Sequence, residues 1–232
     1  FKRKKKLITN LTKTSSIWEI NKAAEEVVSE LKRKRQPLLA ATLEDYLAGK
    51  RIQKRVDPKE LRTLKSVKAA ETELRLKVNR RLVTKLSYIL RNQHQIKRDE
   101  RIKFRIRARD LVRPYNKSIE EFINASKDSR LKVEGKFELN KIPNRKKLKL
   151  KGELCYNWEN DYRWRVGKRK LLPGYGFIED YQFKKLANQQ ARTYKMYAQW
   201  SYYLSTKLSL LHSEVDTLRT WCWREFCSFE HV

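Results

Sequence analysis

Lysine and arginine are the residues of this sequence whose spacing points most directly to a ligand. They gather in four short clusters, at residues 2–6, 32–35, 50–55 and 141–151. A run of cations on a helix is usually a solvated face balanced by nearby carboxylates, and this explanation suits residues 58–75. It fails for residues 136–151, where seven cations stand against Glu138 alone. Phosphate groups are the anions that such an unbalanced cluster is expected to contact.

Residues 101–109 alternate a cation with an apolar residue without interruption. In a strand, this period of two places Ile102, Phe104 and Ile106 on one face and five cations on the other. The cations then recur about every 6.6 Å, a spacing of the same order as that of successive phosphates along a strand. The flanking sequence is helical in character, so a helix ringed by cations is the alternative. Phosphate contact follows from both, because no acidic residue occurs within residues 101–109.

Aromatic and basic residues are interleaved from Trp158 to Lys170. Flat rings beside cations are typical of sites for unpaired bases and their phosphates. Tryptophan is more often packed in a core, so we favour packing for Trp158 and Trp164 and phosphate contact for the neighbouring cations. Across the whole chain, the candidate nucleic-acid-binding residues are Lys2, Arg3, Lys4, Lys5, Lys6, Lys32, Arg33, Lys34, Arg35, Arg101, Lys103, Arg105, Arg107, Arg109, Lys141, Arg145, Lys146, Lys147, Lys149, Lys151, Arg163, Arg165, Lys168, Arg169 and Lys170.

Residues that could support catalysis or bind metal are sparse. Cys222, Cys227 and His231 could be zinc ligands, but they include no C-x2-C pair, and the aromatic residues around them favour an apolar helix packed on a core. The acidic residues are scattered, whereas a metal-dependent nuclease needs clustered carboxylates. We therefore predict a protein that is not an enzyme and has no cofactor and no metal site.

Composition narrows the class of partner. The 232 residues include 56 Lys and Arg against 27 Asp and Glu, a net charge of +29, while 40% of residues are hydrophobic and 11% aromatic. Such a chain can bury a core and attracts a dense anionic partner. No apolar run reaches the roughly 18 residues of a membrane-spanning helix, so we expect no membrane partner. Three cysteines are too few for a disulfide framework, which indicates an intracellular, reducing compartment: cytoplasm, nucleus or organelle matrix.

Five of the six glycines lie between residues 135 and 176. Because glycine weakens a helix, the first and last thirds are expected to be helical. The sequence predicts a helix from Ile17 to Arg35, with Ser16 and Glu19 as a capping box and Pro37 as its stop. A shorter helix capped by Thr42 follows and ends near Gly49.

A third helix is predicted from Asp57-Pro58 onward, with a break near residues 92–97. A short helix is expected at residues 118–126. Residues 131–139 and 148–156 alternate apolar and polar positions, which predicts a β-hairpin with a basic tip at residues 141–147.

The resulting fold prediction is α+β and predominantly helical, with long amphipathic helices and one basic β-hairpin in the middle third. The predicted divisions are a basic extended arm at 1–14, a helical region at 15–128, a hairpin and aromatic-basic loop region at 129–176, and a helical region at 177–232.

The distribution of cations along the whole chain favours a non-catalytic RNA-binding protein, a structural component of a large ribonucleoprotein particle such as a ribosome or organellar ribosome. Its expected partners are structured RNA and other proteins of the particle. One alternative is a DNA-binding or chromatin-complex scaffold subunit. A second is an accessory domain of a nucleic-acid-processing enzyme. A sequence-specific DNA reader usually concentrates its charge on one module with a recognition helix, which is unlike this chain.

Overall fold

The computed structural model describes residues 15–49, 53–92, 101–113, 129–141, 147–163, 169–172, 176–187 and 191–209. Five strands form a mixed sheet in the order β1-β7-β4-β3-β2, and two short strands, β5 and β6, pair separately. The chain divides into two compact units. Unit 1 comprises residues 1–68, 111–130 and 158–198, and unit 2 comprises residues 69–110, 131–157 and 199–232.

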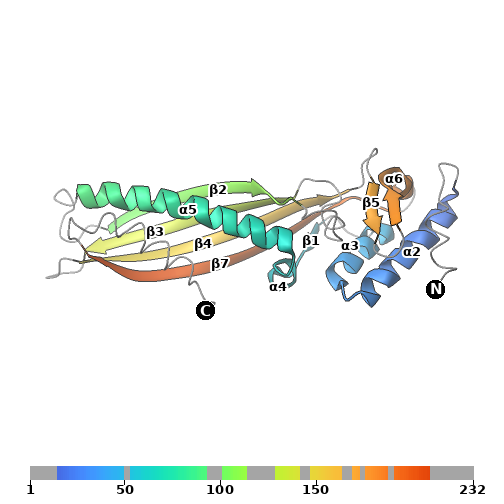
Figure 1. Ribbon diagram of the computed structural model, residues 1–232, viewed down its shortest axis with the longest axis horizontal. Coiled ribbons are helices and arrows are strands. Elements are labelled where there is room, and N and C mark those ends of the chain that lie inside the picture. Colours follow the sequence, from blue (N-terminus) through green and yellow to red (C-terminus); the bar gives the residue numbers. More distant parts are fainter. Residues whose placement is uncertain are drawn as a thin grey trace. The chain divides into compact units, whose positions relative to one another are not determined.

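Figure 1 shows the elements in chain order. The described helices are α2 (Ile17–Arg33), α3 (Pro37–Ala48), α4 (Pro58–Leu61), α5 (Lys65–Arg91) and α6 (Asp180–Ala187). The strands are β1 (Gln53–Arg55), β2 (Arg101–Leu111), β3 (Arg130–Lys141), β4 (Lys147–Tyr162), β5 (Arg169–Leu172), β6 (Gly176–Glu179) and β7 (Tyr194–Ser209). None of the helices among these residues is long and apolar enough to cross a membrane.

The start of α2 confirms the predicted capping box, because Glu19 donates its backbone N–H to the Ser16 hydroxyl and accepts from the Ser16 backbone. Its end differs from the prediction. Arg35 has a left-handed backbone (φ 56°), its N–H donates to the Lys32 carbonyl, and the next N–H donates to the Leu31 carbonyl. This double hydrogen bond is the Schellman motif, and it ends the helix before proline is reached.

Pro37 begins α3, where its fixed φ and missing N–H suit the first helical turn. Thr42 was wrongly predicted to be a cap. It lies buried in the middle of α3, and its hydroxyl donates to the Leu39 carbonyl at 2.8 Å. The predicted end near Gly49 is confirmed, because Gly49 caps α3 with φ 60°. Asp57 acts as a cap as predicted and accepts from the Lys59 N–H at 2.8 Å, but the helix that it begins, α4, ends at Leu61, and the long helix α5 begins separately at Lys65.

Aromatic side chains hold the core of unit 1. Tyr162 lies between Tyr46 and Tyr194, with ring centroids 5.8 and 5.3 Å away. The Tyr194 hydroxyl donates to the Thr42 carbonyl at 2.7 Å. Trp158 is 1% exposed and donates its indole N–H to the Ser129 hydroxyl at 2.8 Å, which confirms the packing role predicted for this ring. At the edge of this unit, β1 pairs in parallel with β7.

In unit 2, α5 runs along one face of the sheet (Figure 1). Leu74, Val78, Leu82 and Leu86 recur every fourth residue on the helix and are fully buried. This 3.6-residue stripe is the predicted amphipathic pattern. Alternate residues of β3, β4 and β7 are also buried, Leu131 and Tyr202 among them. We call this side of the unit 2 sheet the covered face.

The prediction of a predominantly helical protein with long helices was wrong. The sheet extends through four long strands, and the arrows of β2 and β3 point in opposite directions (Figure 1). The alternating segments at 131–139 and 148–156 are strands as predicted, within β3 and β4. Residues 101–109 are also a strand, which decides the open alternative. The helical prediction after residue 177 fails at β7, where apolar and polar residues alternate.

Candidate nucleic-acid interface

The second face of the unit 2 sheet is lined by charged side chains. We call it the open face, and it consists of the odd-numbered positions of β2, β4 and β7 and the even-numbered positions of β3, because side chains alternate along each strand. In the part of unit 2 that the structure describes, no helix packs on it (Figure 1). Its described side chains are ten cations and three carboxylates, Glu134, Glu138 and Glu153. The cations are Arg101, Lys103, Arg105, Arg107, Arg109, Lys132, Lys136, Lys149, Lys151 and Lys207.

The five cations of β2 form the longest row of this face, and all are exposed. The opposite side chains of the strand pack inward; Phe104, for example, stacks on Phe137 with ring centroids 5.3 Å apart. Alternation in an extended backbone thus anchors the row through its apolar half and leaves the cationic half in solvent. The spacing along the row is about 6.6 Å.

The three carboxylates lie between cations. Glu134 forms ion pairs with Arg107 at 3.0 Å and with Arg105 at 3.9 Å. The Asn140 amide donates to Glu138 at 2.8 Å, and this hydrogen bond, together with Lys103, Arg101 and Lys151, lowers the pKa of that carboxyl. The Glu138 carboxyl therefore stays charged at neutral pH, and ten cations less three carboxylates give the described side chains of this face a formal net charge of +7.

A hollow of about 530 Å³ lies within unit 2. Each of the four long strands contributes three consecutive residues to it, and the middle residue of each triplet belongs to the covered face. The outer members of the triplets bring four cations, two carboxylates and two hydroxyls to its walls: Lys103, Arg105, Lys136, Glu138, Lys151, Glu153, Tyr203 and Ser205. We call this the cationic hollow.

Tyr203 is the aromatic side chain of the cationic hollow on the open face, and it is 63% exposed. Its hydroxyl hydrogen-bonds to Glu153, and the charge of that carboxylate raises the pKa of Tyr203. The Cys155 thiol donates to Glu153, and this hydrogen bond, together with Tyr203 and the nearby Lys136, lowers the pKa of that carboxyl; the Ser201 hydroxyl donates to the Cys155 sulfur at 3.4 Å. The ring thus projects into solvent, while its hydroxyl stays protonated at neutral pH and hydrogen-bonds to Glu153.

Unit 1 has a hollow of its own, of about 560 Å³, with a different charge balance. Arg130, Arg163 and Lys195 line it together with Glu159 and Asp161. Three cations against two carboxylates make it nearly neutral. No group of three or more His, Cys, Asp or Glu residues that could hold a metal ion occurs among the described residues.

The predicted cations of the α2 terminus have carboxylate partners. Lys32 pairs with Glu44 at 2.5 Å, and Arg33 and Lys34 pair with Glu30 at 2.6 and 3.7 Å. Together with the structural role of Arg35 in the Schellman motif, these pairs make the cluster at 32–35 a helix terminus in which two carboxylates offset part of the charge of four cations. It is a weaker candidate for phosphate contact than the open face.

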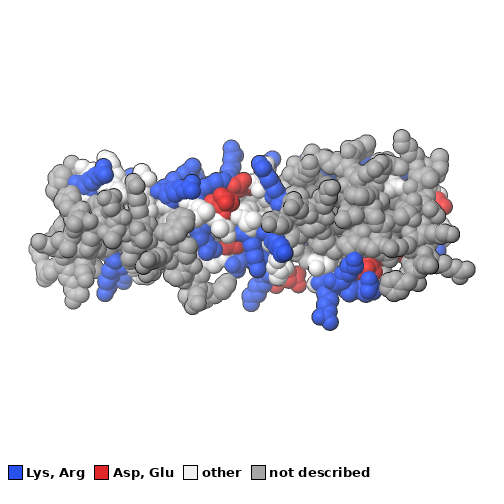
Figure 2. Space-filling model, viewed as in Figure 1, with Lys and Arg blue, Asp and Glu red and all other residues white. Residues whose placement is uncertain are grey.

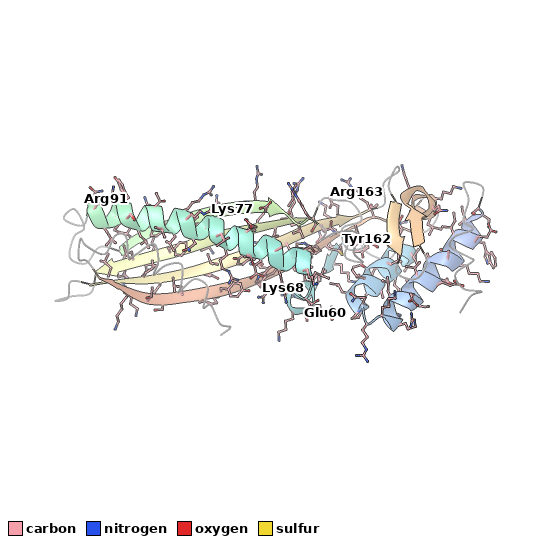
Figure 3. All side chains as sticks on the ribbon, viewed as in Figure 1. Glu60, Lys68, Lys77, Arg91, Tyr162 and Arg163 are labelled. Carbon is pink, nitrogen blue, oxygen red and sulfur yellow. The ribbon has the colours of Figure 1, made fainter. Side chains whose placement is uncertain are left out.

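The remaining candidates divide between the strands and the undescribed segments. All five predicted β2 cations, together with Lys149 and Lys151, lie on the open face. Lys141 and Lys147 are the ends of β3 and β4, Arg163 follows β4 (Figure 3), and Arg169 and Lys170 lie in β5. Lys2, Arg3, Lys4, Lys5, Lys6, Arg145, Lys146, Arg165 and Lys168 lie outside the described residues, as do Trp164, the predicted helix at 118–126 and the C-terminal cysteines and histidine.

Sequence reasoning did not include Lys132, Lys207 or Tyr203 in the predicted site. A sequence signal for the strand that holds Tyr203 was present, because apolar and polar residues largely alternate in β7. It was overridden by the lack of glycine after residue 176, which favoured a helix. A wrong secondary-structure prediction therefore hid the one exposed ring of the cationic hollow.

On the side of the molecule seen in Figure 2, Lys and Arg side chains project from several places on the described surface, and acidic patches are smaller. Comparisons of the chain with protein-family models, with curated proteins and with solved structures gave no match. The fold and the charge pattern therefore carry the functional argument.

Proposed function

We propose that this chain is a non-catalytic RNA-binding protein whose open face binds the RNA backbone, and that it serves as a structural component of a ribonucleoprotein particle. The observation that carries the proposal is the row of five exposed cations on β2, set within a face of ten cations and three carboxylates. Binding of phosphates by Lys and Arg gains free energy through the release of condensed counterions.

The geometry of the open face supports a polyanion rather than a small ligand. The row from Arg101 to Arg109 spans nine residues of extended chain, about 26 Å at 3.3 Å per residue. A single phosphorylated metabolite would contact only a small part of it. A nucleic-acid strand can contact cations along its whole length, and its affinity grows with each phosphate neutralised.

The shape of this surface favours RNA over duplex DNA. Sequence-specific DNA readers usually insert a helix or a narrow two-stranded ribbon into the major groove. Here the cations lie on a broad sheet four strands wide, and an exposed tyrosine accompanies them. Folded RNA exposes unpaired loops and irregular backbones, which a broad cationic sheet can follow.

A charge-matched pair of variants tests this proposal. In the open-face variant, Arg101, Lys103 and Arg109 are replaced by Gln, which leaves the Glu134 ion pairs intact. In the α5 control, the exposed residues Arg80, Lys85 and Arg91 are replaced by Gln, which removes the same charge from the helix (Arg91 is labelled in Figure 3). Fluorescence anisotropy with a labelled structured RNA measures the affinity of the full chain.

We expect the open-face variant to bind at least about tenfold more weakly and the α5 control to bind within about threefold of the unmodified chain, because a phosphate-contacting cation acts locally. Equal losses in the two variants would mean that net charge alone attracts the RNA. A duplex DNA of equal length, bound more tightly than RNA by the unmodified chain, would favour the DNA-scaffold alternative instead.

A further inference from the structure

We propose that the cationic hollow is a binding site for an unpaired nucleotide, whose base stacks on the ring of Tyr203 while its flanking phosphates contact the surrounding cations. This inference rests on the proposed function and adds to it the form of the RNA, a single-stranded segment. The structural basis is the placement of a 63% exposed ring in a hollow that also holds Lys103, Arg105, Lys136 and Lys151.

Exposure sets Tyr203 apart from its neighbour along the strand. Tyr202 is 5% exposed and its ring packs against Tyr156, with centroids 5.7 Å apart. Tyr203 leaves most of a large apolar ring in water, which is unfavourable for the free protein and is relieved when another flat surface covers it. A nucleobase is such a surface, and stacking on an aromatic side chain is tolerant of base identity.

Other exposed rings among the described residues differ in their setting. Trp18 has the Lys22 ammonium 5.0 Å from its ring centroid, and Tyr88 has the Lys85 ammonium at 5.6 Å. Both lie on helices. Tyr197 is 43% exposed and lies on β7 in the hollow of unit 1, where two carboxylates nearly offset three cations. The setting of Tyr203 combines a higher exposure, an extended strand and a hollow in which four cations stand against two carboxylates. This combination matches a nucleotide, which has a flat base and a charged backbone.

The hydroxyl of Tyr203 has a positioning role. It hydrogen-bonds to Glu153, which in turn accepts from the Cys155 thiol. These contacts restrict the rotation of the ring, so less conformational entropy is lost when a base stacks on it. Stacking itself uses the ring face and not the hydroxyl, so a phenylalanine at this position should retain most of the binding.

Bases inside an RNA duplex are paired and stacked on one another, so their faces are not available to a protein ring. The inference therefore predicts a difference between single-stranded and double-stranded RNA that depends on Tyr203 alone. The cations of the open face contact phosphates in both forms, and substitutions there should weaken both.

The test measures binding of two RNA probes, a twelve-nucleotide oligouridine with a central 2-aminopurine and a hairpin duplex with the same number of phosphates. The full-chain proteins are the unmodified chain, Tyr203→Ala, Tyr203→Phe and the open-face variant. For Tyr203→Ala we expect affinity for the single strand to fall roughly 5- to 150-fold, the range that corresponds to about 1–3 kcal/mol of stacking. Affinity for the duplex should change less than twofold.

The 2-aminopurine fluorescence gives a direct readout of stacking. It should be quenched on binding to the unmodified chain and to Tyr203→Phe, and unquenched in any residual complex with Tyr203→Ala. If Tyr203→Ala leaves both the affinity and the quenching unchanged, the nucleotide site is wrong while the RNA-binding proposal stands. If the unmodified chain binds neither probe, the RNA-binding proposal itself is overturned.

Discussion

The two faces of the unit 2 sheet are built from the same strands and have opposite chemistry. On the covered face, Tyr202 donates its hydroxyl to the buried Glu71 carboxylate at 2.5 Å, and the Arg75 guanidinium lies 5.0 Å from its ring centroid. On the open face, Tyr203 projects into solvent among cations. Adjacent residues of one type therefore serve two purposes, stability on one side and, we propose, binding on the other.

This difference has a physical origin in the period of the strand. A shift of one residue along a strand moves a side chain from one face to the other. Whether a tyrosine is buried or exposed therefore depends on its odd or even position in the strand. The covered face can bury charge because Glu71 is compensated by Arg75 at 2.8 Å and by the Tyr202 hydroxyl. The open face keeps its charges in water, where unpaired cations cost little.

The largest predicted effect compares the two tyrosines directly. Tyr202→Ala should lower the free energy of unfolding by about 3–5 kcal/mol, because it leaves a cavity beside Tyr156 and removes a donor from Glu71. Tyr203→Ala should change it by no more than about 0.5 kcal/mol, as is usual for surface substitutions. Urea denaturation followed by circular dichroism measures both. Equal losses would show that the two faces do not differ in the way described.

The next effect concerns the buried ion pair of the covered face. Arg75→Leu should destabilise the chain by about 2–3 kcal/mol, because it removes the cation that compensates the buried Glu71 carboxylate. This value is below the usual loss for a fully buried pair because the Arg75 side chain is 23% exposed. Adding Glu71→Gln to Arg75→Leu should recover part of the lost stability. A double variant less stable than Arg75→Leu would show that the charge of Glu71 is not the source of the loss.

The alternation of apolar and polar residues made part of this structure predictable from the sequence. The strands β3 and β4 and the basic row of β2 follow from period-two patterns, and the caps of α2 and α4 follow from local side-chain chemistry. The strand β7 was missed because the lack of glycine after residue 176 outweighed its alternating pattern, and the long-range pairing that stabilises the strand cannot be read from the sequence. The burial of Tyr202 against α5 likewise depends on residues more than 100 positions apart.

A smaller stability effect is expected at Gly152, a covered-face position next to Lys151 of the open face. A Cβ atom at Gly152 would lie 2.7 Å from the Phe137 ring, closer than van der Waals contact permits. Gly152→Ala should therefore cost about 1–3 kcal/mol through displacement of that ring. Lys151→Ala is the matched control and should stay within about 0.5 kcal/mol in the same denaturation experiment. A neutral Gly152→Ala would mean that the ring has room to move.

The smallest effect is an expected gain in binding on the open face. Glu134→Gln removes the carboxylate that Arg105 and Arg107 share, so both guanidinium groups become available to phosphate. Affinity for structured RNA should rise about two- to threefold, while stability should change by less than about 1 kcal/mol because the ion pairs are solvent-exposed. Anisotropy titration measures the gain. A loss of affinity would indicate that Glu134 positions the arginines for binding.

The central claim is that the open face binds RNA through its phosphates, and the salt dependence of binding tests it most directly. A plot of log affinity against log salt concentration for the unmodified chain should have a slope of about −4 or steeper, which corresponds to six or more phosphates of a single strand. The open-face variant should lose about three contacts and have a correspondingly shallower slope, while the α5 control keeps the original slope. A slope near zero, or an equal change in both variants, would contradict the account.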